Sequence, residues 1–185
     1  RAKAVITFNP LTNEIRSGQA DAPAGFSHWL LKFDGVVDQQ MGTSSGYGRV
    51  EMAYYMMAQA ARIVMTECRL LEENNRAHFM TKRFDRASNN DKFHIQSFCA
   101  IMHYDFNEIT AYSYEQLFET MRSMLLPYPD AEQLFRRMVF NVMAKNCDDH
   151  TKNFSFIMDK TGQWKLSPAF DVCHSYRPGS SWVSQ

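Results

Sequence analysis

A change of pattern at residues 87–92 most constrains what this chain can fold into. Before this polar linker, short apolar stretches alternate with turn residues, which predicts strands and one helix. After it, stretches with helical periodicity predominate. We therefore predict an α+β protein of two parts, a small strand-rich lobe over 1–86 and a mainly helical lobe over 87–185. The expected strands are 4–8, one beginning at Ile15, 27–33, 63–71, 77–84, 154–158 and 164–166, and the expected helices are 49–62, 93–103, 113–126 and 131–145.

The composition is that of a soluble globular protein. The 185 residues are 45% hydrophobic and include 20 basic and 20 acidic side chains, a balance that argues against disorder. No segment approaches the roughly 18 apolar residues of a membrane helix, and the lack of a basic excess argues against general nucleic-acid binding. The cysteines are widely spaced and form no CxxC pair, and no signal peptide is evident. We therefore expect reduced thiols in a cytoplasmic protein.

Two patterns carry structural expectations of their own. The residues Gly42–Gly48 predict a flexible loop before the first helix. The helical pattern 131–145 has a broad apolar stripe, which predicts a buried helix. The residues of this stripe are Leu134, Phe135, Met138, Val139, Val142 and Met143.

The densest polar cluster in the chain is the segment 145–153, which lies between the predicted helix 131–145 and the apolar strand 154–158. Adjacent carboxylates at Asp148 and Asp149 are costly to place between such elements unless they face a solvent-filled cleft. Another carboxylate, Asp171, follows a short hairpin. The spacing of 5 residues from Asp148 to Asn153 and of 23 to Asp171 is typical of a kinase catalytic loop and its metal-binding aspartate.

Phosphoryl transfer accounts for these side chains together. Asp148 is placed to orient an acceptor hydroxyl and accept its proton, and Lys152 to neutralise the transferring group. Asn153 and Asp171 offer the oxygen ligands that Mg²⁺ prefers. Upstream, Lys32 lies inside an apolar strand, where a lysine can reach the α- and β-phosphates of ATP if a helix carboxylate holds it. Glu51, in the first turn of the next helix, is the candidate carboxylate.

The wording of four segments goes further. Trp-Leu-Leu-Lys-Phe-Asp at 29–34, Lys-Arg-Phe-Asp-Arg at 82–86, Asp-Asp-His-Thr-Lys-Asn-Phe-Ser at 148–155 and Leu-Ser-Pro-Ala-Phe-Asp at 166–171 together resemble the HipA family. This family comprises the serine/threonine protein kinase toxins of bacterial toxin–antitoxin pairs. The resemblance extends from Arg1 to about Tyr176.

The resemblance implies a two-lobed fold like that of protein and lipid kinases, with ATP and Mg²⁺ in the cleft. Residues near Lys82 and Phe84 then correspond to the hinge that contacts adenine. The resemblance also implies phosphorylation of a translation protein such as an aminoacyl-tRNA synthetase, with growth arrest and persistence as the result. A DNA-binding antitoxin of the HipB type is the implied partner.

Three departures from the family pattern stand out. The family's Ser- and Gly-rich loop, which carries a regulatory serine, is expected just before Arg1, and its carboxy-terminal helices are expected after Gln185. Lys82 stands where many relatives have Glu, so the expected adenine contacts at this position are through the backbone.

Other functions compete with the kinase hypothesis. One is an inactive or truncated kinase fold that only binds an antitoxin-like partner. A second is a metal-dependent phosphohydrolase that uses Asp148, Asp149, His150 and Asp171. A third, much weaker, is a zinc site at Cys147, His150, Cys173 and His174, where the adjacency of the last two residues suits tetrahedral coordination poorly.

Overall fold

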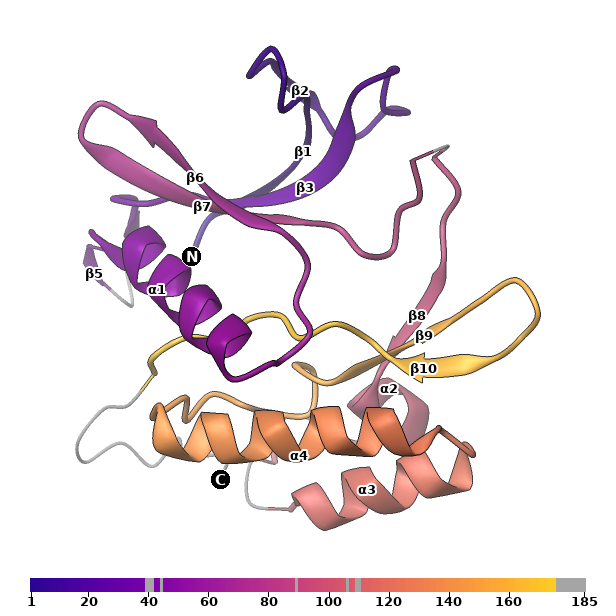
Figure 1. Cartoon of the computed structure of the whole chain (residues 1–185). Coiled ribbons are helices and arrows are strands. Elements are labelled where there is room, and N and C mark those ends of the chain that lie inside the picture. The colour runs from indigo at the N-terminus through magenta and orange to yellow at the C-terminus, as the bar shows by residue number, and fades with distance from the viewer. Residues whose placement is uncertain (39–41, 44, 89, 106, 109–110, 176–185) are drawn as a thin grey trace. The chain divides into compact units, whose positions relative to one another are not determined.

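The computed structural model describes residues 1–38, 42–43, 45–88, 90–105, 107–108 and 111–175. The chain forms two compact units, which are coloured by residue number in Figure 1. The first unit contains Arg1–Met56 and Thr66–Lys92, and the second contains Met57–Met65 and Phe93–Gln185. The linker 87–92 therefore belongs to the strand-rich unit, and the first helix contributes residues to both units.

The first unit is built on an antiparallel sheet with the strand order β2-β1-β3-β7-β6 (Figure 1). Alternate side chains of β1, β3 and β7 form its core, because successive residues of a strand point to opposite faces. This core contains Ile6, Phe8, Trp29, Leu31 and Met80. The strands are β1 (Lys3–Phe8), β2 (Ile15–Ser17), β3 (Ser27–Lys32), β6 (Cys68–Glu73) and β7 (Arg76–Lys82).

Helix α1 (Tyr47–Ala60) confirms the predicted helix and begins two residues earlier. Its position depends on Gly48, since a Cβ at that residue would lie 1.8 Å from the carbonyl oxygen of Ala77 on β7. The predicted loop before the helix contains a short strand, β5 (Gly42–Thr43), which pairs with β4 (Val37–Asp38). Ser44, also in the predicted loop, lies outside the described residues.

The second unit combines a small antiparallel sheet, in the order β10-β9-β8, with helices. Helices α3 and α4 lie side by side (Figure 1). A capping box between Ser113 and Gln116 explains why α3 begins where it does. The strands are β8 (His94–Ser97), β9 (Ser155–Met158) and β10 (Trp164–Leu166), and the helices are α2 (Phe98–Met102), α3 (Tyr114–Ser123) and α4 (Tyr128–Met143).

The core of the second unit consists of Phe98, Leu117, Met121, Leu134, Phe154, Phe156 and Leu166. A smaller cluster joins the end of α1 to the segment after β10, through Ala58, Ile63 and Ala169. None of the four cysteines, all of which lie in the described part of the chain, forms a disulfide. No helix in the described part of the chain is long and apolar enough to cross a membrane.

Several structural predictions were wrong in part. The predicted strand 63–71 begins only at Cys68. Because α1 begins at Tyr47, Glu51 lies beyond its first turn.

The predicted helix 93–103 begins only at Phe98, because His94–Ser97 pairs with β9 and Ser97 then caps α2. The predicted buried stripe of α4 is largely exposed, with Phe135 54% and Met143 79% accessible. Of the predicted stripe, Leu134 is fully buried. The other buried positions of α4 are polar, Arg137 and Asn141, and both have hydrogen-bond partners inside the second unit.

Candidate functional site

The first unit holds the predicted lysine–glutamate pair. Lys32 is the last residue of β3, and Glu51 lies in α1. The Nζ atom of Lys32 donates a hydrogen bond of 2.7 Å to Oε1 of Glu51, and the two side chains are only 5% and 8% exposed. The predicted ion pair is therefore present, and it is almost completely removed from water.

A second cation, which no pattern in the sequence predicted, shares this carboxylate. Arg1 donates through Nη2 to the other carboxylate oxygen of Glu51, and its side chain is 13% exposed. The second terminal nitrogen of Arg1, Nη1, is buried and has no hydrogen-bond partner among the described residues. A buried donor without a partner is costly, so an anionic ligand that accepts from Nη1 of Arg1 would stabilise this cluster.

The predicted hinge residues lie at the end of β7, whose last residue is Lys82. Lys82 is exposed, but its backbone N–H already donates to the Glu67 carbonyl at 2.9 Å. Its carbonyl accepts a 2.7 Å hydrogen bond from Thr66. Phe84, two residues on, is partly buried. An adenine contact through the Lys82 amide would thus have to replace a hydrogen bond within the first unit.

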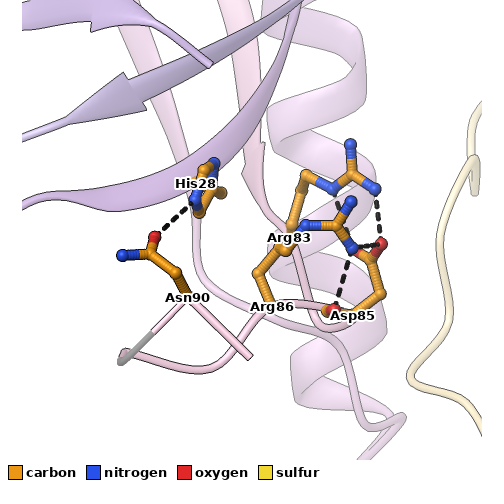
Figure 2. Close-up of polar contacts among 5 residues, drawn as sticks. All are labelled: His28, Arg83, Asp85, Arg86 and Asn90. Carbon is orange, nitrogen blue, oxygen red and sulfur yellow. Dashed lines mark hydrogen bonds and ion pairs between the residues drawn. The ribbon is translucent and has the colours of Figure 1, made fainter. Parts of the chain in front are cut away.

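An ionic cluster stiffens the segment that contains Phe84. Arg83 approaches the Asp85 carboxylate with two nitrogens, one of them at 2.7 Å, and Arg86 donates to the same carboxylate and to the Asp85 carbonyl (Figure 2). Burial disfavours the charged form of Asp85, but the hydrogen bond from Arg83 and the charges of both arginines outweigh it. The pKa of Asp85 is therefore held below its ordinary value.

This lowered pKa predicts a pH-dependent contribution to stability. An acid with a lowered pKa in the folded state stabilises the protein above its ordinary pKa, about 3.9, and loses that contribution as the pH falls through the folded-state value. We expect Asp85→Asn to destabilise the chain at neutral pH and to differ little from the parent well below pH 4. Urea unfolding across this range measures the difference. Glu14→Gln, which alters an exposed pair with Arg16, is the matched control. A stability difference for Asp85→Asn that persists unchanged into acid would contradict the expectation.

The linker 87–92 is anchored to the first unit by Asn90. Its Oδ1 accepts from the Ala22 backbone at 2.7 Å and lies 3.1 Å from Nε2 of the buried His28 (Figure 2). Its Nδ2 donates to the Ala22 carbonyl at 3.2 Å, and the Arg83 amide donates to the His28 carbonyl at 2.9 Å. Asn90 is thus attached to the first unit by several hydrogen bonds, which composition did not reveal.

In the second unit, the structure separates the roles of the two adjacent aspartates. Asp149 is 5% exposed. It accepts a hydrogen bond from the hydroxyl of Tyr114 on α3, and Asn141 on α4 lies within 3.5 Å. Burial and the nearby Asp149 charge raise the pKa of Tyr114 well above its ordinary value, so this hydroxyl remains a donor. Asp149 anchors the loop to two helices.

Asp148 has the opposite environment. Its side chain is 49% exposed, and Nε2 of His150 lies 3.7 Å from its Oδ1, too far for a hydrogen bond. A carboxylate of this accessibility can meet an acceptor hydroxyl, whereas the buried Asp149 cannot. The phosphohydrolase alternative needs Asp149 as well as Asp148, His150 and Asp171. Because Asp149 is buried, it is not available for that role.

The loop also orients Asn153. Its Nδ2 donates to the Asp148 carbonyl at 2.7 Å, and its backbone amide donates to the His150 carbonyl at 2.8 Å. Because the first hydrogen bond uses the side-chain nitrogen of Asn153, the side-chain oxygen is the atom that can bind a cation. The preceding residue, Lys152, is exposed, which suits a side chain that interacts with a ligand.

Asp171 lies at an exposed bend after β10. Its φ angle of 56° is in the left-handed region, which is uncommon for a residue other than glycine. Such conformations persist only where flanking contacts hold them. Before Asp171, the Ala169 amide donates a hydrogen bond to the Val64 carbonyl at 2.8 Å. After it, Ser175 donates hydrogen bonds to Lys145 and Asn146.

Metal-binding clusters of the alternative kinds are not found. Among the residues that the structure describes, no three or more His, Cys, Asp or Glu side chains group so as to hold a metal ion. This leaves the zinc alternative without a site in that part of the chain. Asn153 and Asp171 are not a group of this kind, because such a group contains only His, Cys, Asp and Glu and has at least three members.

Two solved structures share the fold. The HipA chain in the Shewanella oneidensis complex of HipA, HipB and operator DNA matches with a TM-score of 0.71 and 15% identity, over 93% of this chain and 42% of that one. The Helicobacter pylori proinflammatory kinase CtkA matches with a TM-score of 0.56 and 12% identity, over 80% of this chain and 52% of that one. The chain thus spans about half or less of each solved chain. No curated protein sequence matches it.

The likeness to HipA and CtkA agrees with the predicted α+β, kinase-like fold. At the level of sequence, the model of the HipA-like C-terminal domain matches residues 1–184, nearly the whole chain. The chain therefore belongs to the HipA-like C-terminal domain family.

Proposed function

We propose that this chain is the core of an ATP- and Mg²⁺-dependent serine/threonine protein kinase of the HipA type. The observation that carries the proposal is the buried ion pair of Lys32 with Glu51, whose carboxylate also binds Arg1. A lysine that a carboxylate holds in place, next to an arginine, can bind anionic groups through charge-assisted hydrogen bonds. The phosphates of ATP have this chemistry, and the carboxylate between the cations holds Lys32 in place.

The second unit supplies the groups for the transfer itself. The acceptor hydroxyl oxygen forms a bond to the γ-phosphorus as the bond to the ADP oxygen breaks, and Asp148 takes the hydroxyl proton. Lys152 lowers the cost of the negative charge on the transferring group. Asp149, which is bonded to Tyr114, keeps the loop in place without reaching the reactants.

The predicted metal ligands fit Mg²⁺. The oriented carbonyl oxygen of Asn153 and the exposed carboxylate of Asp171 are hard oxygen donors, and Mg²⁺ is usually held by one or two such groups with water and phosphate oxygens. When bound, Mg²⁺ would neutralise part of the charge on the phosphates. The role of the two side chains is to present these oxygens at fixed positions.

The proposal includes the partners expected of the family. The solved Shewanella oneidensis HipA is in a complex with HipB and operator DNA, which supports a HipB-type antitoxin as the partner of this protein. We propose a cytoplasmic protein substrate of the translation machinery, such as an aminoacyl-tRNA synthetase, whose phosphorylation arrests growth and promotes persistence.

Nucleotide binding tests whether Lys32 binds phosphate. We expect Lys32→Met to weaken ATP binding by about ten- to a hundredfold, the loss typical of a charge-assisted hydrogen bond of roughly 1.5–3 kcal/mol, and to leave adenosine binding unchanged. Isothermal titration calorimetry with ATP and with adenosine measures both affinities. Lys165→Met, which alters an exposed lysine of β10, is the matched control. Equal ATP affinity in Lys32→Met and the parent would refute the phosphate-binding role.

A further inference from the structure

A buried asparagine joins the two segments that carry the proposed metal ligands. Asn146 is 2% exposed and stands at the start of the loop that contains Asp148 and Asn153. Its Oδ1 accepts a 3.2 Å hydrogen bond from the hydroxyl of Ser175, four residues after Asp171. We propose that Asn146 is a positioning residue that holds the Asp171 segment in register with the Asn153 loop. This inference rests on the proposed function.

The geometry of Asn146 makes it a rigid reference point. Its backbone amide donates to the Asn141 carbonyl at 2.9 Å, and its Nδ2 donates to Oδ1 of Asn141 at 3.0 Å. Asn141 is itself buried in α4 and donates to the Tyr114 hydroxyl at 3.0 Å. Asn146 is therefore fixed to the end of α4, and α4 is connected to the partner of Asp149 on α3.

The attachment of the Asp171 segment has two points. The Ser175 backbone amide donates to the Lys145 carbonyl at 3.2 Å, while the Ser175 hydroxyl bonds to the neighbouring Asn146. Two hydrogen bonds to adjacent residues define an orientation as well as a distance. With Ala169 bonded to Val64, Asp171 lies between two anchored positions, which accounts for its ability to retain a left-handed conformation.

Asparagine is the side chain that this position requires. Its amide donates to Asn141 and accepts from Ser175 at once, because it carries a donor and an acceptor on one rigid group. Aspartate has the same shape but no donor. Asn146→Asp would therefore place a carboxylate oxygen against the side-chain oxygen of Asn141, Oδ1. Ser175→Ala removes only the connection between the two segments and leaves the loop attached to α4.

Metal binding provides the first readout. We expect Ser175→Ala to weaken the binding of Mn²⁺ to the protein–ADP complex by about tenfold, the lower end of what outer-shell contacts contribute to metal affinity. Electron paramagnetic resonance of Mn²⁺ measures this directly. Ser175→Thr, which keeps the hydroxyl, should restore most of the affinity. Ser123→Ala, which removes a hydroxyl hydrogen bond of 3.0 Å within α3, should have no effect.

Amide hydrogen exchange provides the second readout, which is independent of nucleotide chemistry. In Ser175→Ala, exchange should accelerate both in 146–153 and in the segment around Asp171, since each loses its connection to the other. Acceleration confined to the immediate neighbourhood of residue 175, or Mn²⁺ affinity equal to that of Ser123→Ala, would overturn the proposal. If the parent protein binds no Mn²⁺–ADP, the kinase function fails, and hydrogen exchange alone then decides whether Asn146 couples the two segments.

Discussion

Asp148→Asn should lower the rate of phosphoryl transfer by about a hundred- to ten-thousandfold, the range in which a positioned general base contributes. Asparagine keeps the size and polarity of the side chain but cannot accept the hydroxyl proton. ATP affinity should remain that of the parent, because the phosphate-binding charges belong to Lys32 and Arg1. Transfer of labelled γ-phosphate to protein by the complete gene product measures the rate, and calorimetry measures the affinity.

The adjacent aspartate makes this experiment specific. Asp149→Asn should act mainly on folding, since Asp149 is buried against Tyr114 and Asn141. Asp159→Asn, which removes the charge of a half-buried residue in the turn between β9 and β10, is the control for a lost charge. If Asp148→Asn labels protein as fast as the Asp159→Asn control does, the assignment of Asp148 as the base is wrong.

The largest expected effect on stability comes from Glu51→Ala. This change removes the carboxylate that lies between two almost fully buried cations, Lys32 and Arg1. Breaking a buried ion pair by removing one partner typically costs about 3–5 kcal/mol, because the remaining charge is left desolvated. We expect a loss of that size in the free energy of unfolding, measured with urea at neutral pH.

A surface pair provides the comparison. Glu72 pairs with Arg49 at 2.9 Å, but the two side chains are 61% and 59% exposed, and exposed pairs contribute only about 0–1 kcal/mol. Glu72→Ala should therefore be nearly neutral. A Glu51→Ala chain as stable as Glu72→Ala would show that water reaches the Lys32 cluster, and the case for a polyanion at this site would then be lost.

Much of the secondary structure was predictable because local patterns determine it. The strands around Lys32 and the hairpin β9–β10 follow from alternation and turn residues, which act over a few positions. The residues 93–103 were predicted as one helix because a short apolar segment fits the periodicity of a helix as well as that of a strand. Pairing with β9, a partner some 60 residues away, makes the first half a strand, and no local pattern carries that information.

The sequence by itself determined the chemistry of the candidate residues. The spacing of Asp148, Asn153 and Asp171 and the lysine within an apolar strand follow from the order of residues along the chain. Only the tertiary structure decided which side chains are buried and which are accessible to solvent. It buried Asp149 and left Asp148 accessible, brought Arg1 to the carboxylate of Glu51, and buried Arg137 and Asn141 of α4. The reason is physical: burial and charge pairing depend on contacts between residues far apart in sequence, and these contacts form only when the chain folds.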